Sequence, residues 1–343
     1  MTTILATIFV FGLLVFVHEL GHFLTAKATG MRVDEFAIGF GPEIYQVREG
    51  ETLYSLRLIP LGGYNKIAGM DPDEPNLDSR AFIYQSLPAR LLVIAAGSLM
   101  NFLLPVFLFF IVIFSSGIDK PANTPVLGTV LPNRPAAVAG LATGDKILSV
   151  GGMETNDWMS IVEALRHRAD QPTRIVAERE NSQFTVEVTP VFDPRGERGV
   201  IGIIPQFTKE YPGLVESATL SVKQVFYVTG AMVSQLSQMI TGKVDPEVSG
   251  PIGVAQMAGE VAKQGIIPLV QFAAFLSLNL GLINLLPIPA LDGGHIITLL
   301  IEGVRGKPLN GRQLQWIQTI GIALLLMLLV FATASDLGRL KIW

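Results

Sequence analysis

Five residues near the N-terminus, His18-Glu19-Leu20-Gly21-His22, have a spacing that suits metal-dependent hydrolysis. Residues four apart on a helix lie on one face, so both imidazoles can direct a nitrogen at a single ion. A glutamate between them can act as a general base beside that ion. The alternative is a pair of helix-interior histidines bonded to neighbouring helices, but ionisable side chains are costly in an apolar segment and by default functional. The pattern predicts His18 and His22 as metal ligands and Glu19 as the base.

A catalytic zinc usually has three protein ligands and one open position, so a third ligand is needed. The chain has no cysteine, which excludes thiolate ligands and a cysteine nucleophile. Asp292 borders a long apolar stretch, and we expect it to be the third ligand. Pro287 and Pro289 should break the helix before it, and irregular backbone at membrane depth is tolerated where it is buried or lines a wet cavity. Asp292 as a helix N-cap and His295 as a competing ligand remain alternatives.

The segments that carry these residues are those of a membrane protein. Hydrophobic residues make up 50% of the 343 residues, charged residues make up 16%, and the mean hydropathy is +0.47. Four tracts lack Asp, Glu, Lys and Arg: 1–17, 91–118, 264–291 and 313–335. A span needs about 20 residues, and the first tract reaches this length once 18–26 are added. A net charge of −4 without a long basic run argues against nucleic acid as a partner.

We therefore expect a polytopic α-helical membrane protein with four spans, a membrane-associated β-hairpin and an inserted α+β domain. Alternating polar and apolar residues predict the hairpin, and short β-branched strands with one helical stretch predict the inserted domain. Residues 211–240 are rich in Ser, Thr and Gln, which favours an interfacial helix over a fifth span. The expected segments are a first transmembrane helix, 1–27; a hairpin and loop, 28–90; a second transmembrane helix, 91–118; the inserted domain, 119–209; an amphipathic linker, 210–263; a third transmembrane helix and loop, 264–312; and a fourth transmembrane helix and tail, 313–343.

The distribution of Lys and Arg predicts the orientation in the membrane. Residues 27–90 contain seven of them, and the loop after the third span contains Arg305, Lys307 and Arg312. Cytoplasmic loops carry an excess of these residues, so both loops should be cytoplasmic, with the termini and the inserted domain outside. The predicted metal site then lies toward the cytoplasmic side.

These motifs together resemble the intramembrane site-2 protease family, and within it the bacterial regulator-of-sigma-E protease (RseP) branch. The likeness rests on HELGH in the first span, NLLPIPALDGG in the third, and VLPNRPAAVAGLATGDKILSVGG, which resembles PDZ domains of bacterial periplasmic proteases. IGFGPEIY, IPLGGYNK and AGSLMNFLLP extend it over essentially the whole chain. Many RseP-like proteins have two tandem PDZ domains, whereas this chain has room for one.

The resemblance implies a zinc metalloprotease with Zn²⁺ held by His18, His22 and Asp292, and with Glu19 as the general base. It also implies that Asn279 and Asn284 contact the substrate backbone, although interhelical hydrogen bonding explains two amides at this spacing almost as well. The expected substrate is a single-pass membrane protein, such as an anti-sigma factor or a signal-peptide remnant, cut in or near its transmembrane helix. The expected location is the bacterial inner (plasma) membrane, as a multi-pass protein embedded in the lipid bilayer with an extracytoplasmic PDZ domain.

The hairpin and the PDZ domain should both act on the substrate. The 34–64 hairpin should offer an edge strand that holds the unwound substrate, with Ser55 and Arg57 at the edge. The PDZ domain should either capture chain ends or exclude bulky ectodomains.

The rival functions are a membrane-tethered PDZ adaptor with a structural metal and a metal transporter. An open coordination position beside Glu19 argues against the adaptor, and the lack of an acidic or histidine path across the bilayer argues against the transporter.

Overall fold

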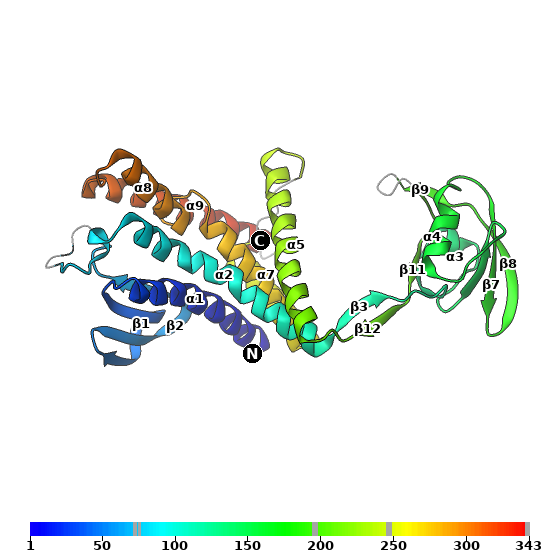
Figure 1. Ribbon diagram of the computed structural model, residues 1–343, viewed down its shortest axis with the longest axis horizontal. Helices are drawn as coiled ribbons and strands as arrows, with labels where there is room; N and C mark the ends of the chain where they lie inside the picture. Colours follow the sequence, from blue (N-terminus) through cyan, green and yellow to red (C-terminus); the bar gives the residue numbers. More distant parts are fainter. Residues whose placement is uncertain (71–73, 75–76, 194–197, 245–248, 340–343) are drawn as a thin grey trace. The chain divides into compact units, whose positions relative to one another are not determined.

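The computed structural model describes residues 1–70, 74, 77–193, 198–244 and 249–339, and Figure 1 draws the remainder as a grey trace. The chain divides into two units: unit 1 contains Met1–Ser116 and Gly213–Trp343, and unit 2 contains Gly117–Pro212. Unit 1 combines long helices with one pair of long strands, whereas unit 2 consists mostly of short strands.

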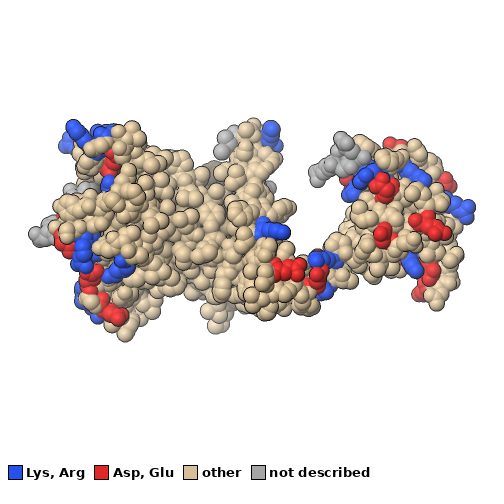
Figure 2. Space-filling view, in the orientation of Figure 1, with Lys and Arg blue, Asp and Glu red and all other residues tan. Residues whose placement is uncertain are grey.

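Four described helices of unit 1 are long and apolar enough to cross a membrane: α1 (Thr2–Ala28), α2 (Leu87–Ser116), α7 (Ile266–Asn284) and α9 (Gly311–Arg339). A helix satisfies its own backbone hydrogen bonds, which is what a spanning segment requires. Figure 2 shows a broad surface without charged side chains over the middle of unit 1, with Lys and Arg gathered over the end that carries the strands and α8. The structure thus contains the four long apolar helices that the sequence predicts for a membrane-embedded protein.

Three of these helices pack closely at small residues. Ala273 and Ala274 of α7 are fully buried in a cluster that includes Val10 of α1 and Leu108 of α2. Small side chains allow helix backbones to approach each other in a membrane, where packing rather than the hydrophobic effect drives association. The cluster fixes α1, α2 and α7 as one body, and these helices carry most of the site described below.

The other helices of unit 1 are the 3₁₀ turn η1 (Phe82–Tyr84), α5 (Leu214–Ile240), α6 (Pro251–Gln264) and α8 (Asp292–Arg305). The helix α5 packs against α2 and buries Val225, and it is not among the four spanning candidates. Asp336 of α9 accepts hydrogen bonds of 2.9 Å from the backbone N–H groups of Gly250 and Gly253 at the start of α6. A carboxylate at a helix N-terminus is favourable, so this contact ties α6 to α9.

The hairpin is formed by β1 (Val33–Glu49) and β2 (Thr52–Ile67), which are both longer than ordinary strands. The strand β2 bends at Gly62, whose φ is +136°, so that both of its halves pair with the first half of β1. Ala37, for example, faces Ser55 on one side and Tyr64 on the other. Residues 43–49 of β1 pair with the other side of residues 52–57, so the two bent strands form a sheet of four segments rather than a simple two-stranded hairpin.

This pairing corrects the expected edge position. Ser55 pairs with both Ala37 and Gln46, so it lies in the interior of the sheet. Arg57 faces Glu43, and its guanidinium binds Glu35 at 2.7 Å and Glu43 at 3.0 Å. The prediction that Ser55 and Arg57 lie at an edge was wrong, because β1 bends at Gly39 and Gly41, so that its second half, residues 43–49, pairs with the other side of residues 52–57. The described edges are residues 43–49 and 63–67.

Unit 2 is built from short strands and two helices around its own core. A four-stranded sheet has the order β6-β5-β7-β8, and further pairs join β4 to β11, β9 to β10 and β3 to β12. Ile147, Ile161 and Ile175 are almost completely buried in its core. The elements are β3 (Ile118–Pro121), β4 (Leu127–Val130), α3 (Pro135–Val138), β5 (Lys146–Val150), β6 (Met153–Glu154), α4 (Trp158–Arg166), β7 (Thr173–Arg179), β8 (Ser182–Val188), β9 (Val191–Asp193), β10 (Arg198–Val200), β11 (Ile203–Pro205) and β12 (Phe207–Glu210).

Candidate metal centre

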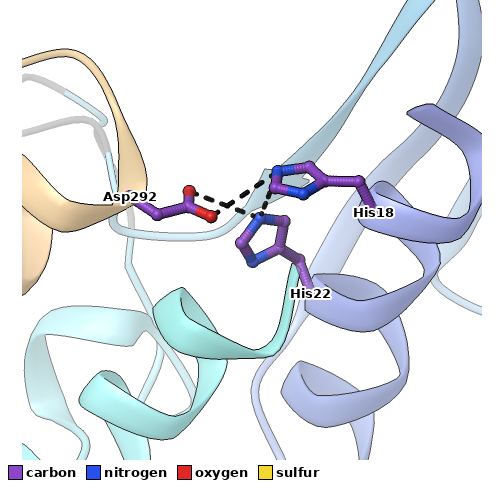
Figure 3. A group of neighbouring side chains, drawn as sticks. All are labelled: His18, His22 and Asp292. Carbon is purple, nitrogen blue, oxygen red and sulfur yellow. Dashed lines mark hydrogen bonds and ion pairs between the residues drawn. The ribbon is translucent and has the colours of Figure 1, made fainter. Parts of the chain in front are cut away.

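Two histidines on successive turns of α1 form one side of the site. The helix runs without a break from Thr2 to Ala28, so the four-residue spacing places His18 and His22 on one face. Their Nε2 atoms lie 3.2 Å apart, and both side chains are largely buried, with exposures of 11% and 12%. Figure 3 shows both rings turned toward Asp292.

Asp292 completes the group from a different helix. The helix α7 ends at Asn284, and the loop that follows contains two prolines that cannot continue it before α8 begins at Asp292. A Cβ on Gly293 would lie 2.2 Å from the backbone oxygen of Leu286, so this tight turn requires glycine. The cap position of α8 is Leu291, and no side chain caps the helix. Helix capping therefore does not explain the carboxylate.

The three side chains have the spacing of a zinc site. The distance from Asp292 Oδ2 to His18 Nε2 and that from Asp292 Oδ1 to His22 Nε2 are both 3.6 Å. Tetrahedral zinc with bonds of about 2.0–2.1 Å holds its ligand atoms about 3.3–3.4 Å apart. The observed separations of 3.2 and 3.6 Å bracket that value. Among the described residues, this is the one group of three such side chains close enough to share an ion.

The contacts of Nδ1 in each imidazole are also those expected when Nε2 binds a metal ion. Nδ1–H of His22 donates to the backbone oxygen of Val93 at 2.8 Å, which leaves Nε2 as the free lone pair. The amide of Asn101 lies 3.1 Å from Nδ1 of His18, and its Oδ1 is buried with no partner in the part of the chain that the structure describes. Turning this amide over places Oδ1 on His18 Nδ1–H, which satisfies the oxygen and frees Nε2 for an ion.

The two carboxylates have their own partners. Nδ2 of Asn65, on β2, donates to Oε2 of Glu19 and to the backbone oxygen of Glu19, both at 2.7 Å. The hydroxyl of Ser98, on α2, donates to Oδ2 of Asp292 at 2.7 Å. Every side chain of the group is thus held by a neighbour, which restricts its orientation as an ion site requires.

A close approach of α1 and α2 makes room for His22. A Cβ on Gly97 would lie 2.2 Å from His22 Nε2, and a Cβ on Gly21 would lie 2.5 Å from the backbone oxygen of Ala96. Glycine at these two positions lets the imidazole rest directly on the backbone of α2. A larger side chain at position 97 would displace the ring.

The structure places the remaining predicted residues outside this group. Asn279 and Asn284 lie in the last turns of α7, half-buried, and neither side chain makes a hydrogen bond within the described part of the chain. Interhelical hydrogen bonding therefore does not account for these two amides. His295 lies one turn after Asp292 and lines a cavity of about 740 Å³ together with Thr298 and Glu302.

Sequence reasoning assigned no role to Asn65, Ser98 or Asn101. Asn101 carried a usable signal, because an amide inside an otherwise apolar span needs a partner. Asn65 carried none, since its position depends on how β2 folds back over β1. The hydroxyl of Ser98 has no sequence feature that separates it from an ordinary helix serine.

Comparisons with known proteins identify a family and relatives for the whole chain. The sequence profile described as "Peptidase family M50" matches residues 6–328. The regulator of sigma-W protease RasP of Bacillus subtilis is 32% identical, with 98% of this chain and 99% of the relative covered. The zinc metalloprotease RasP of Geobacillus kaustophilus is 33% identical, with 98% of each chain covered. A PDZ domain from Listeria monocytogenes covers 25% of this chain and 90% of its own length at 18% identity, with a TM-score of 0.21, which is too low to assign a fold.

Proposed function

Since the chain belongs to peptidase family M50, we propose that it is a zinc metalloprotease that hydrolyses a peptide bond in or near the transmembrane helix of its substrate. The observation that carries this proposal is the triangle of His18, His22 and Asp292 next to Glu19, on helices apolar enough to span a membrane. His18, His22 and Asp292 would hold the ion through Nε2, Nε2 and a carboxylate oxygen. The ligand set leaves a fourth position for water, as catalytic zinc sites require.

The residues of this chain divide the reaction between them. When bound, zinc polarises the scissile carbonyl and lowers the pKa of the attacking water toward about 7. Glu19 accepts the proton of that water on its carboxylate and then delivers it to the leaving amine. Asn65 keeps this carboxylate in place, because its amide binds Oε2 and the Glu19 backbone together. The Glu19 carboxylate is therefore already oriented before the reaction begins, so the barrier does not include the entropy cost of orienting it.

Replacing Glu19 tests this assignment. Glu19→Gln keeps the size of the side chain and removes its ability to take a proton, so cleavage should fall by at least about 100-fold with zinc still bound. Glu216→Gln is the matched control, since Glu216 is exposed in the first turn of α5. Turnover of Glu19→Gln at the rate of the control would rule out Glu19 as the base. If wild type binds metal but neither it nor the variants cleave any substrate, the adaptor function would be favoured.

We further propose that the substrate is a single-pass membrane protein, with an anti-sigma factor as the first candidate. This candidate comes from the relative described as a regulator of sigma-W protease. Comparative proteomics of membranes containing wild-type or Glu19→Gln protein should reveal the substrate as an intact protein that accumulates with the variant. Accumulation of no membrane protein would contradict this substrate class.

The edge strand 63–67 is the proposed holder of the unwound substrate. Peptide bonds in a helix are occupied by hydrogen bonds, so the substrate must unwind before it is cut, and an exposed strand edge can then pair with it. A Cβ on Gly63 would lie 3.2 Å from Cγ of Glu19, so this edge runs beside the base. A photo-crosslinker at Lys66 should trap substrate on Glu19→Gln protein, whereas one at Val47, on the other edge, should not. Equal crosslinking at both positions would reject this edge.

Unit 2 is proposed to be a PDZ domain that binds a chain end. Its core and strand pairs enclose a cavity of about 700 Å³ between α4, β10 and β11. Arg134 and Arg198 line this cavity with apolar side chains such as Leu165, and Nε of Arg198 is buried without a partner among the described residues. Two cations beside an apolar groove suit the terminal carboxylate and the last side chain of a peptide. Steric exclusion of bulky ectodomains is the alternative role.

The proposed orientation is that of a multi-pass protein of the bacterial inner membrane, with β1, β2 and α8 cytoplasmic and unit 2 outside. Lys and Arg gather over the first group, together with Asp and Glu (Figure 2), and cytoplasmic loops commonly carry an excess of Lys and Arg. The absence of native cysteine permits a direct test. A single cysteine at Asn181, in the β7–β8 turn, should react with a membrane-impermeant maleimide in intact cells, and one at Arg48 should react only after lysis. The reverse pattern would overturn the orientation.

A further inference from the structure

The hydroxyl of Ser98 is directed away from its own helix. Serine and threonine in helices commonly donate to the backbone oxygen four residues earlier. Five hydroxyls within the described helices do this at 2.6–2.9 Å: those of Thr7, Ser115, Thr219, Thr319 and Thr333. Ser98 instead donates at 2.7 Å to Oδ2 of Asp292, which lies on α8.

The position of this bond makes it strong. Ser98 is completely buried, and the acceptor is a carboxylate whose side chain is only 14% exposed. A hydrogen bond to a charged acceptor is shorter and stronger than one between neutral groups, and water competes little for it in a buried place. The carboxylate of Asp292 is therefore held in one orientation by a residue from a different helix.

The bond distinguishes the two oxygens of Asp292. Each oxygen lies 3.6 Å from one histidine Nε2, Oδ2 from that of His18 and Oδ1 from that of His22. Ser98 donates to Oδ2, whereas Oδ1 accepts no hydrogen bond within the described residues. Three residues further along α2, on the same face, Asn101 contacts the ring of His18. One face of α2 thus supports a predicted ligand of α1 and a predicted ligand of α8.

From these contacts we propose that Ser98 is a positioning residue of the metal centre: it fixes Asp292 through Oδ2 and leaves Oδ1 as the oxygen that binds the ion. The inference rests on the proposed function, because it concerns the ion that the function requires. A carboxylate that binds through one oxygen leaves the remaining coordination position to water. Without Ser98 the carboxylate can rotate, and the ion should be held less firmly.

The test compares Ser98→Ala with Ser115→Ala. Both changes remove one hydroxyl from α2, and alanine favours helix, but the partners of the Ser115 hydroxyl in the described part of the chain all belong to α2 itself. Purified full-length protein loaded with zinc is mixed with excess chelator, and zinc release is followed by a colorimetric indicator. Loss of an outer hydrogen bond usually weakens metal binding by about 10–100-fold, so Ser98→Ala should release zinc faster by about that factor and Ser115→Ala should not.

Two further measurements separate positioning from a structural role. Zinc-free Ser98→Ala should melt somewhat below zinc-free wild type, because a buried carboxylate loses its donor, and the gain in melting temperature on adding zinc should also be smaller for Ser98→Ala. Cleavage by Ser98→Ala at low zinc should recover on adding zinc, with no change in KM for the substrate. A lower melting temperature of the zinc-free variant with unchanged zinc release would mean that Ser98 only packs the helix, and the inference would be overturned.

The outcomes also separate this inference from the proposed function. Wild-type protein without stoichiometric zinc would overturn the proposed function and this inference with it. Stoichiometric zinc in wild type, released from Ser98→Ala at the wild-type rate, would overturn the inference alone.

Discussion

The side chain of Asn65 holds Glu19 at two points, with hydrogen bonds of 2.7 Å to Oε2 and 2.7 Å to the backbone oxygen. Asn65 belongs to the edge strand 63–67, so the sheet edge proposed to bind the substrate also orients the proposed base. A movement of this strand on substrate binding would therefore be transmitted to the carboxylate. In the proposed mechanism, this one amide would link substrate binding to proton transfer.

Removing this amide should slow the reaction without removing the metal. Asn65→Ala should lower kcat by about 10–100-fold, because the carboxylate must then be ordered at each turnover. The measurements are kcat on a purified substrate and zinc content by mass spectrometry. Zinc content should equal that of wild type, and an unchanged kcat would show that Asn65 does not orient the base.

Filling the space at Gly97 should disrupt the metal centre through His22. The added Cβ of Gly97→Ala would lie 2.2 Å from Nε2, so the ring must move away from its present position. Zinc affinity should fall by at least about tenfold, as a displaced ligand implies. Gly230→Ala is the matched control: nothing lies near a Cβ there, and alanine should stabilise α5 by up to about 1 kcal/mol. Equal zinc affinity in both variants would contradict the close contact.

The sequence predicted the parts of the site that depend on local periodicity. His18 and His22 follow from a spacing of four on a helix, and Asp292 follows from being the carboxylate that borders the third span. The predicted edge at Ser55 failed, because β1 bends at Gly39 and Gly41 and its second half then pairs with the outer side of residues 52–57. The partners Asn65 and Ser98 come from other elements, and no periodicity within their own segments encodes such contacts.

Removing most of unit 2 should change which substrates are cut. The strands β3 and β12 pair from Ile118↔Glu210 to Pro121↔Phe207, so deletion of residues 126–205 leaves two paired ends that a short linker can join. If unit 2 filters by size, the deletion should speed cleavage of a substrate with an intact ectodomain. If it binds chain ends, the deletion should slow cleavage of a trimmed substrate, and amidating that end should have the same effect. If the intact and the trimmed substrate are each cut at the same rate by the full protein and by the deletion variant, unit 2 is only a spacer.

Unit 2 should lose stability in acid through Asp145. Burial alone would raise the pKa of this carboxyl, but the Arg179 guanidinium at 2.7 Å and the Ala142 backbone N–H hold the pKa below its usual value. A carboxyl with a lowered folded-state pKa stabilises the fold above its unfolded pKa of about 3.9, and this contribution is lost as the pH falls through the folded-state value.

Trp158 packs against the core of unit 2 and can report this loss. Urea unfolding followed by Trp158 fluorescence, with the other two tryptophans replaced by phenylalanine, should show the free energy of unfolding falling below about pH 4. Asp145→Asn should be less stable near pH 6 and should show a flatter dependence on pH. Parallel curves for the two proteins would exclude Asp145 as the source of the acid sensitivity.

The most direct test of the zinc centre is the metal content of purified protein measured by mass spectrometry. Wild type and His167→Ala, which changes an exposed histidine of unit 2, should each hold about one zinc per chain. The double variant His22→Ala with Asp292→Ala should hold almost none, because it keeps one of the three ligands. Stoichiometric zinc in the double variant would contradict the site, and with it the reaction proposed for this protein.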